Sequence, residues 1–327
     1  MATLAAAFGS SHSVMLSSTL DDWLHGFSES DLRMPYFDRG GQRISYQDLL
    51  ASAPANARDY ITQERIAERW RIVQDAMARM TQEIAQAKLD VLVIVGDDQH
   101  ELFTDELMPA VGVYYGEAIR NAARPDTQEN WYRTAQLRRL EEGGDVHYPC
   151  HRALALHLIE GLVEREFDVA ALSALKPGQY EGHAYSFIHR WYLQPAALPI
   201  VPVFLNTYNP PNPPLPRRCI KLGAALKELI ADYPESLRVG LLASGGLSHF
   251  IVDEELDRSV LDALKKKDNA FLSRLDPRRL KAGSSEIRNW LVVAGAVDEL
   301  ELTWVSYTPA YRTPALSGTG LCFARWS

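Results

Sequence analysis

A long amphipathic stretch followed directly by an apolar run constrains the fold of this chain more than any other feature. Residues 59–88 carry apolar side chains at helical spacing, and residues 89–95 are then almost uninterruptedly apolar. A run of that kind is typical of a strand buried on both faces, as in parallel sheets that helices cover on each side. The same alternation recurs along the chain, with helices expected at 151–164 and 219–233 and strands at 4–8, 167–175, 200–205 and 238–242. We therefore predict an α/β fold with a central sheet and helices on both faces.

The chain has no internal repeat and no low-complexity linker, so we expect residues 1–327 to form a single large domain. Residues 21–54 are irregular and rich in aromatic side chains. We expect them to form a lid or a contact with a second copy, and we expect a homo-oligomer. Residues 206–216 are so rich in proline that they predict a rigid connector without regular structure, placed to line a pocket.

Composition indicates a globular protein that can bury a large core, because 46% of the 327 residues are hydrophobic and 23% are charged. The net charge of -8, without a stripe rich in lysine and arginine, argues against nucleic acid as a partner. No apolar run approaches the roughly 20 residues that span a bilayer, so we expect no membrane insertion. Cys150, Cys219 and Cys322 follow no disulfide or zinc spacing, and a reducing cytoplasm is the expected compartment.

Two histidines each follow a small-residue turn at the end of an expected strand. His12 ends the motif Gly9-Ser10-Ser11-His12, and His249 ends the run from Ser244 to His249. Open α/β sheets gather their chemistry at such strand ends, and small residues let a ligand approach the backbone. Imidazole is also the commonest metal ligand. A single histidine of this kind is as often a packed core or rim residue, so the two turns indicate a site only with further members.

Two other elements carry acidic side chains. Residues 96–103 follow the apolar strand and contain Asp97, Asp98, Gln99, His100 and Glu101. This set suits a divalent metal, but it equally suits the acidic first turn of a helix. Residues 284–290 have the capping signature that opens an amphipathic helix, with Glu286 in its first turn. Taken alone, Glu286 is best explained as an ordinary capping-region acid.

Short motifs in a fixed order resemble those of the class III extradiol ring-cleavage dioxygenases, the family typified by the β subunit of protocatechuate 4,5-dioxygenase. The motifs are Ser10-Ser11-His12, Gly96-Asp97-Asp98-Gln99, Gly182-His183, Val201-Pro202-Val203, Asn206-Thr207-Tyr208-Asn209-Pro210-Pro211, Arg217-Arg218-Cys219, Ser244-Gly245-Gly246-Leu247-Ser248-His249, Glu286 and Tyr307-Thr308-Pro309-Ala310-Tyr311. Each motif is weak alone, whereas the ordered set is specific. Within the family the chain is most similar to the single-chain branch that includes 3-O-methylgallate dioxygenase, because both have Tyr36-Phe37-Asp38 and Ser45-Tyr46 in a long segment at 23–50.

The resemblance implies an enzyme that opens a catecholic or gallate-like ring next to the diol and inserts both atoms of dioxygen. Its partners would be a small aromatic diol and O2, and its cofactor a non-haem Fe(II) held by two histidines and one glutamate. His12 and Glu286 match two of the iron ligands. His249 matches the acid/base that takes and returns a proton, a task suited to imidazole. His183 matches a further catalytic group beside substrate or oxygen.

The chain departs from the family at the second histidine ligand. That position is occupied by Gln99, with His100 one residue later, and we place Asp98 and Gln99 beside the cofactor. An imidazole is the better iron ligand, so we expect His100 as the third metal ligand with His12 and Glu286. The alternatives are that Gln99 binds through its amide oxygen, or that the metal has only two protein ligands.

If neither Gln99 nor His100 binds iron, the chain would be a catalytically impaired binding or partner subunit of the same fold. A metal-dependent hydrolase at an acidic strand end is a weaker third interpretation.

Overall fold

A computed structural model describes residues 1–124, 130–194 and 198–327. In these residues nine strands form one mixed sheet in the order β11-β13-β1-β10-β4-β9-β5-β8, with β12 beside β13. The strands are β1 (Thr3–Ser10), β4 (Val91–Gly96), β5 (Val111–Tyr114), β8 (Ala170–Leu172), β9 (Ile200–Leu205), β10 (Arg238–Ser244), β11 (His249–Ile251), β12 (Leu302–Tyr311) and β13 (Ser317–Trp326). The central four, β1, β10, β4 and β9, run parallel. Because these carry the continuous apolar runs, the predicted α/β fold is confirmed.

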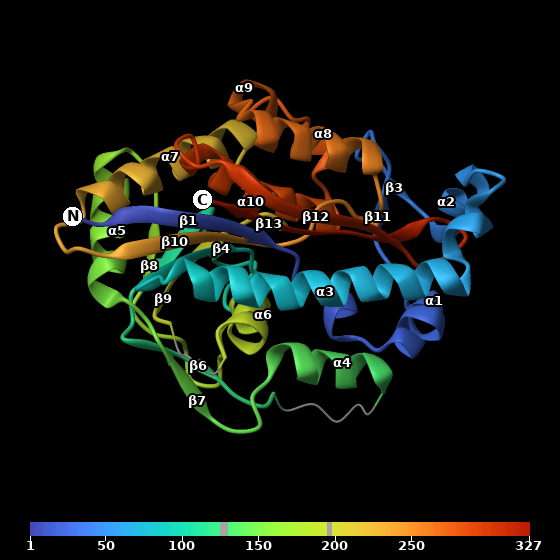
Figure 1. The fold of residues 1–327 in the computed structure, drawn as a ribbon, viewed down its shortest axis with the longest axis horizontal. Helices are drawn as coiled ribbons and strands as arrows, with labels where there is room; N and C mark the ends of the chain where they lie inside the picture. Colours follow the sequence, from blue (N-terminus) through green and yellow to red (C-terminus); the bar gives the residue numbers. More distant parts are fainter. Residues whose placement is uncertain (125–129, 195–197) are drawn as a thin grey trace.

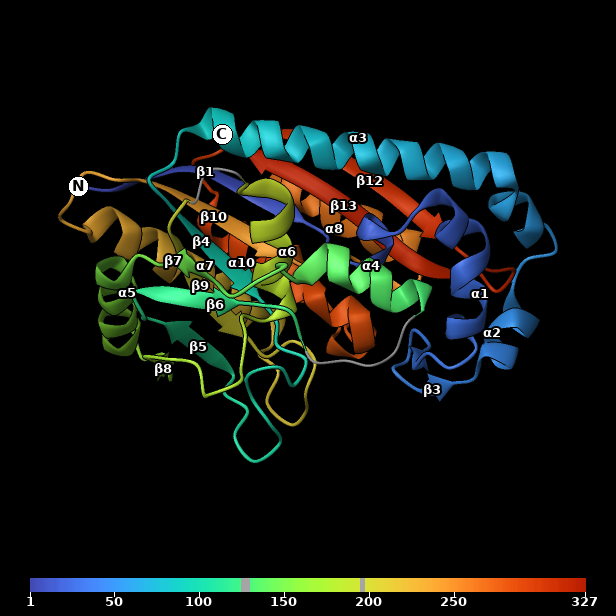
Figure 2. The same cartoon turned by 90° about the horizontal axis from the view of Figure 1, so that it is seen from below.

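Helices pack on both faces of the sheet. The α-helices are α1 (Phe27–Asp31), α2 (Tyr46–Ser52), α3 (Gln63–Ala87), α4 (Trp131–Leu140), α5 (Arg152–Glu164), α6 (His183–Tyr192), α7 (Pro216–Asp232), α8 (Glu254–Lys266), α9 (Asn269–Leu272) and α10 (Ile287–Ala296). Figures 1 and 2 show α3, α4 and α6 on one side of the sheet and α7 and α8 on the other. Each face has its own apolar core. Neighbouring residues of β1 contribute to opposite cores, Ala7 to one and Phe8 to the other, as the alternation of a strand requires.

The segment at 21–54 is more regular than its sequence predicts. It contains a single π-helical turn, η2 (Asp22–Gly26), then α1, the two-stranded β2 (Tyr36–Phe37) and β3 (Arg43–Ile44), and α2. A buried ion pair fastens it to the sheet, since Asp31 lies 2.8 Å from Arg312 just beyond β12. Figure 1 shows this segment gathered at the end of the molecule that β11 reaches. Its predicted role as a lid or as a contact with a second copy stays a prediction.

Three other elements differ from the expectation. Helix α7 begins at Pro216, inside the predicted irregular connector, because proline is well suited to the first position of a helix. Helix α10 is buried all round rather than amphipathic. The long hairpin of β12 and β13 was not expected, and it lies antiparallel to β1 through β13.

The remaining short elements are η1 (Val14–Ser17), η3 (Ala57–Ile61), η4 (Pro277–Arg279), η5 (Ala282–Glu286), β6 (Ala118–Asn121) and β7 (Val146–Pro149). In the described part of the chain no helix combines the length and the apolar character that crossing a bilayer would need. The three cysteines are buried free thiols.

Candidate active site

Four buried side chains from distant parts of the sequence meet at one edge of the sheet. His12 follows β1, Asp97 follows β4, His183 begins α6 and Glu286 immediately precedes α10. One potential ligand atom from each lies within 4.8 Å of all the others. β1 and β4 are parallel strands of one sheet, so their carboxyl ends deliver side chains to the same crevice.

His12 presents an unpartnered nitrogen to this cluster. Its Nδ1 lies 3.0 Å from the Ser244 hydroxyl, which itself donates to the Ala184 carbonyl at 2.7 Å. The hydroxyl oxygen therefore accepts from Nδ1–H, and the imidazole directs its other nitrogen, Nε2, at the cluster. This Nε2 is buried without a hydrogen-bond partner, 3.3 Å from Glu286 Oε2. A buried imidazole nitrogen without a hydrogen-bond partner, facing a carboxylate, is an arrangement that a bound cation would complete.

His183 is held by a carboxylate on the side away from the cluster. Its Nδ1 lies 2.6 Å from Glu101 Oε2, and its backbone N–H donates to both Glu101 oxygens at 3.0 Å. The other nitrogen, Nε2, is 3.6 Å from Asp97 Oδ2. Burial lowers the pKa of His183, but the charges of Glu101 and Asp97 outweigh it and raise that pKa to about 9. A carboxylate behind a histidine in this way fixes the tautomer and orientation of a metal-binding imidazole.

The two buried carboxylates respond to opposite surroundings. Burial raises the pKa of Asp97, and the nearby charge of Glu286 raises it further. Burial also opposes ionisation of Glu286, but His249 and His12 outweigh it and hold the pKa of Glu286 well below its ordinary value. Glu286 accepts a hydrogen bond from the Gly246 backbone N–H at 2.6 Å and makes no cap for α10. The ordinary capping explanation for Glu286 is therefore wrong.

His249 lies at the rim of the cluster. Its Nε2 is 3.2 Å from Glu286 Oε1, and its Nδ1 is 2.9 Å from the Leu247 carbonyl. Burial lowers the pKa of His249, but Glu286 outweighs it and the pKa is raised. Of the residues that form the four-membered cluster, His249 contacts Glu286 alone by a hydrogen bond or ion pair.

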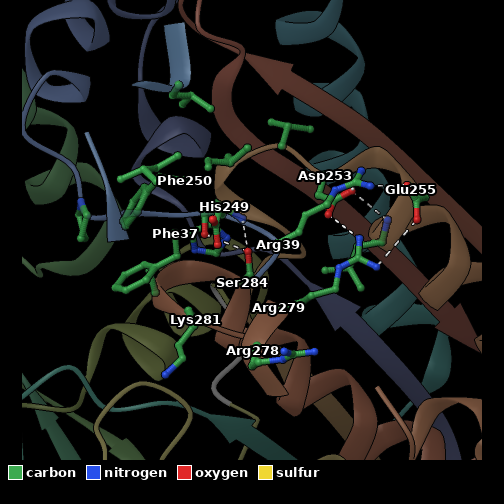
Figure 3. Close-up of a pocket in the computed structure, with 18 of the residues that line it drawn as sticks. Phe37, Arg39, His249, Phe250, Asp253, Glu255, Arg278, Arg279, Lys281 and Ser284 are labelled. Atoms are coloured by element: carbon green, nitrogen blue, oxygen red, sulfur yellow. Dashed lines mark hydrogen bonds and ion pairs between the residues drawn. The ribbon is translucent and has the colours of Figure 1, made fainter. Parts of the chain in front are cut away.

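Two cavities adjoin His249 and Phe250, which line both of them. The smaller cavity, of about 110 Å³, is also lined by His12, Gln99, His183 and Glu286. The larger one, of about 410 Å³, extends beneath the segment at 21–54. Figure 3 shows this larger cavity, with His249, Phe250 and Ser284 in its middle and an ion-pair group to one side formed by Arg39, Arg279, Asp253 and Glu255. His249 and Phe250 therefore stand between the cluster and a larger space that the segment at 21–54 helps to line.

The donor set fits a divalent cation. It combines two imidazoles with two carboxylates, all buried, a mixture that suits borderline metals such as iron. Buried carboxylates that face one another favour a positive charge between them, which a metal ion would supply in place of protonated imidazoles. The residues therefore have the chemistry to hold a metal ion.

Comparison with known proteins agrees with this geometry. Residues 61–321 match the family described as the catalytic LigB subunit of aromatic ring-opening dioxygenase. The chain belongs to the LigB family. Asp97, His183 and Glu286 lie within the matched range, and His12 precedes it.

Two curated relatives are dioxygenases. A gallate dioxygenase of Pseudomonas putida is 29% identical over 170 residues, covering 45% of this chain and 46% of that protein. A 2,3-dihydroxyphenylpropionate/2,3-dihydroxicinnamic acid 1,2-dioxygenase of Comamonas testosteroni is 26% identical over 206 residues, covering 63% of this chain and 54% of that protein. The chain spans about half the length of these relatives.

The structure brings some of the predicted site residues of this LigB-family chain together and separates others. His12, Glu286, His183 and His249 meet as expected. His100 does not join them. Its side chain is 46% exposed, and its Nε2 lies 2.9 Å from Asp105 in the same loop. The cause is the left-handed backbone at His100, with φ 63°, which turns its side chain out of the sheet edge. The expectation of His100 as a metal ligand is therefore not met by this geometry.

Asp98 and Gln99 lie on opposite sides of the same turn. Asp98 accepts hydrogen bonds from the Leu102 and Phe103 backbone N–H groups at 2.9 and 3.2 Å, so it shapes the loop and is turned away from the cluster. Gln99 lines the small cavity and donates to Asp97 at 3.2 Å. Asp98 was expected beside the cofactor, but it shapes the loop instead. Neighbouring residues of an extended segment point to opposite sides, so Asp98 and Gln99 cannot both face the cluster.

Sequence reasoning missed Asp97 and Glu101 as individual site residues, although both lie in the acidic run at 96–103. It also missed Arg139 and Tyr208, which line the small cavity. Tyr208 lies within a motif that the resemblance includes. Arg139 carries no such signal, because a basic residue in the last turn of a helix is common for electrostatic reasons alone.

Proposed function

We propose that this chain is an extradiol dioxygenase that opens an aromatic ring beside its diol. The ring carbon–carbon bond next to the diol would break, and both atoms of dioxygen would enter the product. The observation that carries the proposal is the convergence of His12, His183, Glu286 and Asp97 in a LigB-family chain. The matched relatives act, by their names, on gallate and on 2,3-dihydroxyphenylpropionate.

The proposed cofactor is Fe(II), held by His12, His183 and Glu286, with Asp97 behind them. Two histidines and one carboxylate are the ligand set of many non-haem iron oxygenases, which leaves adjacent positions open. Fe(II) would supply a centre that takes up the diol and dioxygen together and passes electron density from ring to oxygen. In this proposal His183 replaces the histidine that the family has where this chain has Gln99. Its support is the aim of His183 Nε2 at Asp97, with Glu101 behind the ring.

His249 is the proposed proton carrier. A diol must lose a proton to bind as an anion, and an imidazole at the rim of the small cavity lies where that proton would leave. His249 Nδ1 faces the Leu247 carbonyl and Nε2 faces the Glu286 carboxylate, so both partners favour a proton on the nitrogen they face. Binding of Glu286 to the metal would free Nε2 to exchange a proton with the diol. The larger cavity beyond His249 would admit substrate, and the segment at 21–54 would close over it.

Iron loading and a diol panel test the proposed function. Protein reconstituted anaerobically should bind about one Fe(II) per chain and turn one or more catechols into a yellow ring-opened product in air. His12→Ala and Glu286→Ala should each weaken Fe(II) binding at least about a hundredfold, because removing a ligand exceeds the tenfold to hundredfold loss of an outer partner. Both variants should remain folded. Full iron content and activity in both would contradict the ligand set, and His100→Ala is the matched control that should keep its iron.

A second candidate function is a binding or partner subunit that has lost catalysis. It is favoured by one observation, the glutamine at position 99 where the family has a ligand histidine. The same experiment separates the two functions. Protein that takes up no Fe(II), or that binds diols without opening any of them, would support the binding role.

A further inference from the structure

Arg139 is a buried cation that makes no ion pair with any residue the structure describes. It is 9% exposed and lines the small cavity together with His12, His183 and Glu286. Its side chain makes one hydrogen bond in the described part of the chain, from an Nη to the His12 carbonyl at 3.0 Å. Its Nε is buried with no partner among the described residues, and Glu101 and Glu286 act on its charge without forming an ion pair with it. Leaving a buried charge uncompensated is costly, so this arrangement needs an explanation.

The other charged groups around the cavity are already balanced. Arg312, the second arginine that lines it, pairs with buried Asp31 at 2.8 Å. Glu101 faces His183 at 2.6 Å and Arg124 at 3.8 Å. Asp97 and Glu286 face the proposed metal, and their two negative charges would offset a divalent cation. Arg139 is thus the positive charge that remains when every described pair has been made.

An anion that enters with the substrate would complete this site. The guanidinium group forms paired hydrogen bonds with carboxylates and keeps its charge when buried. A carboxylate is ionised in solution at neutral pH, whereas a diol is neutral there, so a fixed cation selects the carboxylate before any proton is lost. We propose that Arg139 makes the enzyme selective for aromatic diols that carry a carboxylate group, by pairing with that group in the small cavity. This inference rests on the proposed function and names its substrate class.

The first test needs no turnover. Thermal unfolding of the full chain loaded with Zn²⁺, which suits the same donors and offsets Asp97 and Glu286 without redox chemistry, is followed with benzoate and with benzamide, which differ in charge but hardly in shape. Benzoate should raise the melting temperature of the wild type more than benzamide does. Arg139→Met should weaken the apparent benzoate affinity about tenfold to a hundredfold, the value of a charged hydrogen bond, and leave benzamide unchanged. Arg138→Met is the matched control, because Arg138 is the exposed neighbour on α4 and its guanidinium donates to the Ser17 carbonyl rather than lining the small cavity.

The second test measures ring opening by the iron-loaded enzyme with 3,4-dihydroxybenzoate and with 3,4-dihydroxybenzamide. Arg139→Met should lower kcat/KM for the acid about tenfold to a hundredfold, chiefly through KM, and change the amide less than about threefold. Arg139→Lys should restore part of the preference, since it restores the charge without the paired geometry.

Several outcomes would overturn the inference. Equal losses for acid and amide would place Arg139 at the shared diol, and equal protection of the wild type by benzoate and benzamide would remove the anion site. The anion site would also be ruled out if neither benzoate nor benzamide raised the melting temperature of the wild type. If no diol is opened, the proposed function fails, and the benzoate experiment still decides the anion site on its own.

Discussion

Helix α6 carries two histidine–glutamate pairs that look alike and differ in what surrounds them. His183 lies 2.6 Å from Glu101, and His189 lies 2.6 Å from Glu181. Both imidazoles are buried, and in each the Nδ1 faces the carboxylate. The pairs differ at the other nitrogen. His183 Nε2 faces Asp97 and the small cavity, whereas His189 stacks on Tyr148 at 3.9 Å and its Nε2 has no partner in the described residues.

The difference teaches that a buried histidine with a carboxylate is not in itself a site. The pair of His189 and Glu181 ties α6 to strand β6, since Glu181 also accepts a hydrogen bond from the side-chain amide of Asn121 at 2.7 Å. The pair of His183 and Glu101 does the same for the loop after β4, but its imidazole also meets His12, whose ring lies 4.5 Å away. Convergence of donors from separate elements is what distinguishes the candidate metal centre from a structural pair.

Replacing each histidine by asparagine should give the largest contrast. Asparagine keeps a donor near the position of Nδ1, so the bond to the glutamate can survive while Nε2 is removed. His183→Asn should lose at least about a hundredfold in Fe(II) affinity and nearly all ring opening, because a ligand is removed. His189→Asn should keep its Fe(II) affinity within about twofold. Metal titration of both folded variants makes the comparison.

A His183→Asn protein that binds Fe(II) like the wild type would remove His183 from the ligand set. The third position would then pass to Gln99, the other side chain that lines the small cavity beside Asp97.

A third histidine, His249, also faces a glutamate and should behave unlike either pair on α6. His249→Phe should leave Fe(II) binding and anaerobic diol binding within about threefold of the wild type. Its turnover should fall by about two to four orders of magnitude, the usual contribution of general acid–base assistance. Steady-state kinetics per bound iron make the measurement. Loss of iron with a normal rate per remaining iron would instead make His249 a ligand of the metal through its position beside Glu286.

The sequence was sufficient to predict the central strands and the helices α3, α5 and α7, because their apolar periodicity is strong. It did not predict α6, whose ten residues HAYSFIHRWY are rich in histidine and aromatic side chains and are mostly buried. Such residues have low helix propensity, and tertiary packing decides their structure. The first half of β12 alternates in burial as a strand with one covered face does, but its place beside β13 depends on a long-range pairing.

The site residues divide in the same way. His12, Glu286 and His249 could be predicted because each matches a motif of the family that the sequence resembles, whereas their places at strand or helix ends alone did not decide their roles. Asp97 and His100 could not be ranked from residue type, since the left-handed backbone at His100 decides which side chain of the loop turns inward. Glu101 was hidden for a related reason. Its partner His183 is distant in sequence, and their pairing depends on where α6 docks.

The smallest contrast concerns the two glutamates behind the histidines of α6. Glu101→Gln and Glu181→Gln each keep an acceptor oxygen and remove one carboxylate charge, partly buried at Glu101 and fully buried at Glu181. Glu101→Gln should weaken Fe(II) binding about tenfold to a hundredfold, because the carboxylate increases the basicity of His183 and fixes its orientation. Glu181→Gln should leave Fe(II) affinity within about twofold and act instead on stability, since it weakens a buried contact that holds α6 to Asn121.

The measurements are metal affinity and the free energy of unfolding of each metal-free variant. If both variants lost metal affinity equally, the two pairs would be coupled through α6 as a rigid unit. The position of the helix, rather than the charge behind His183, would then set the affinity of the centre.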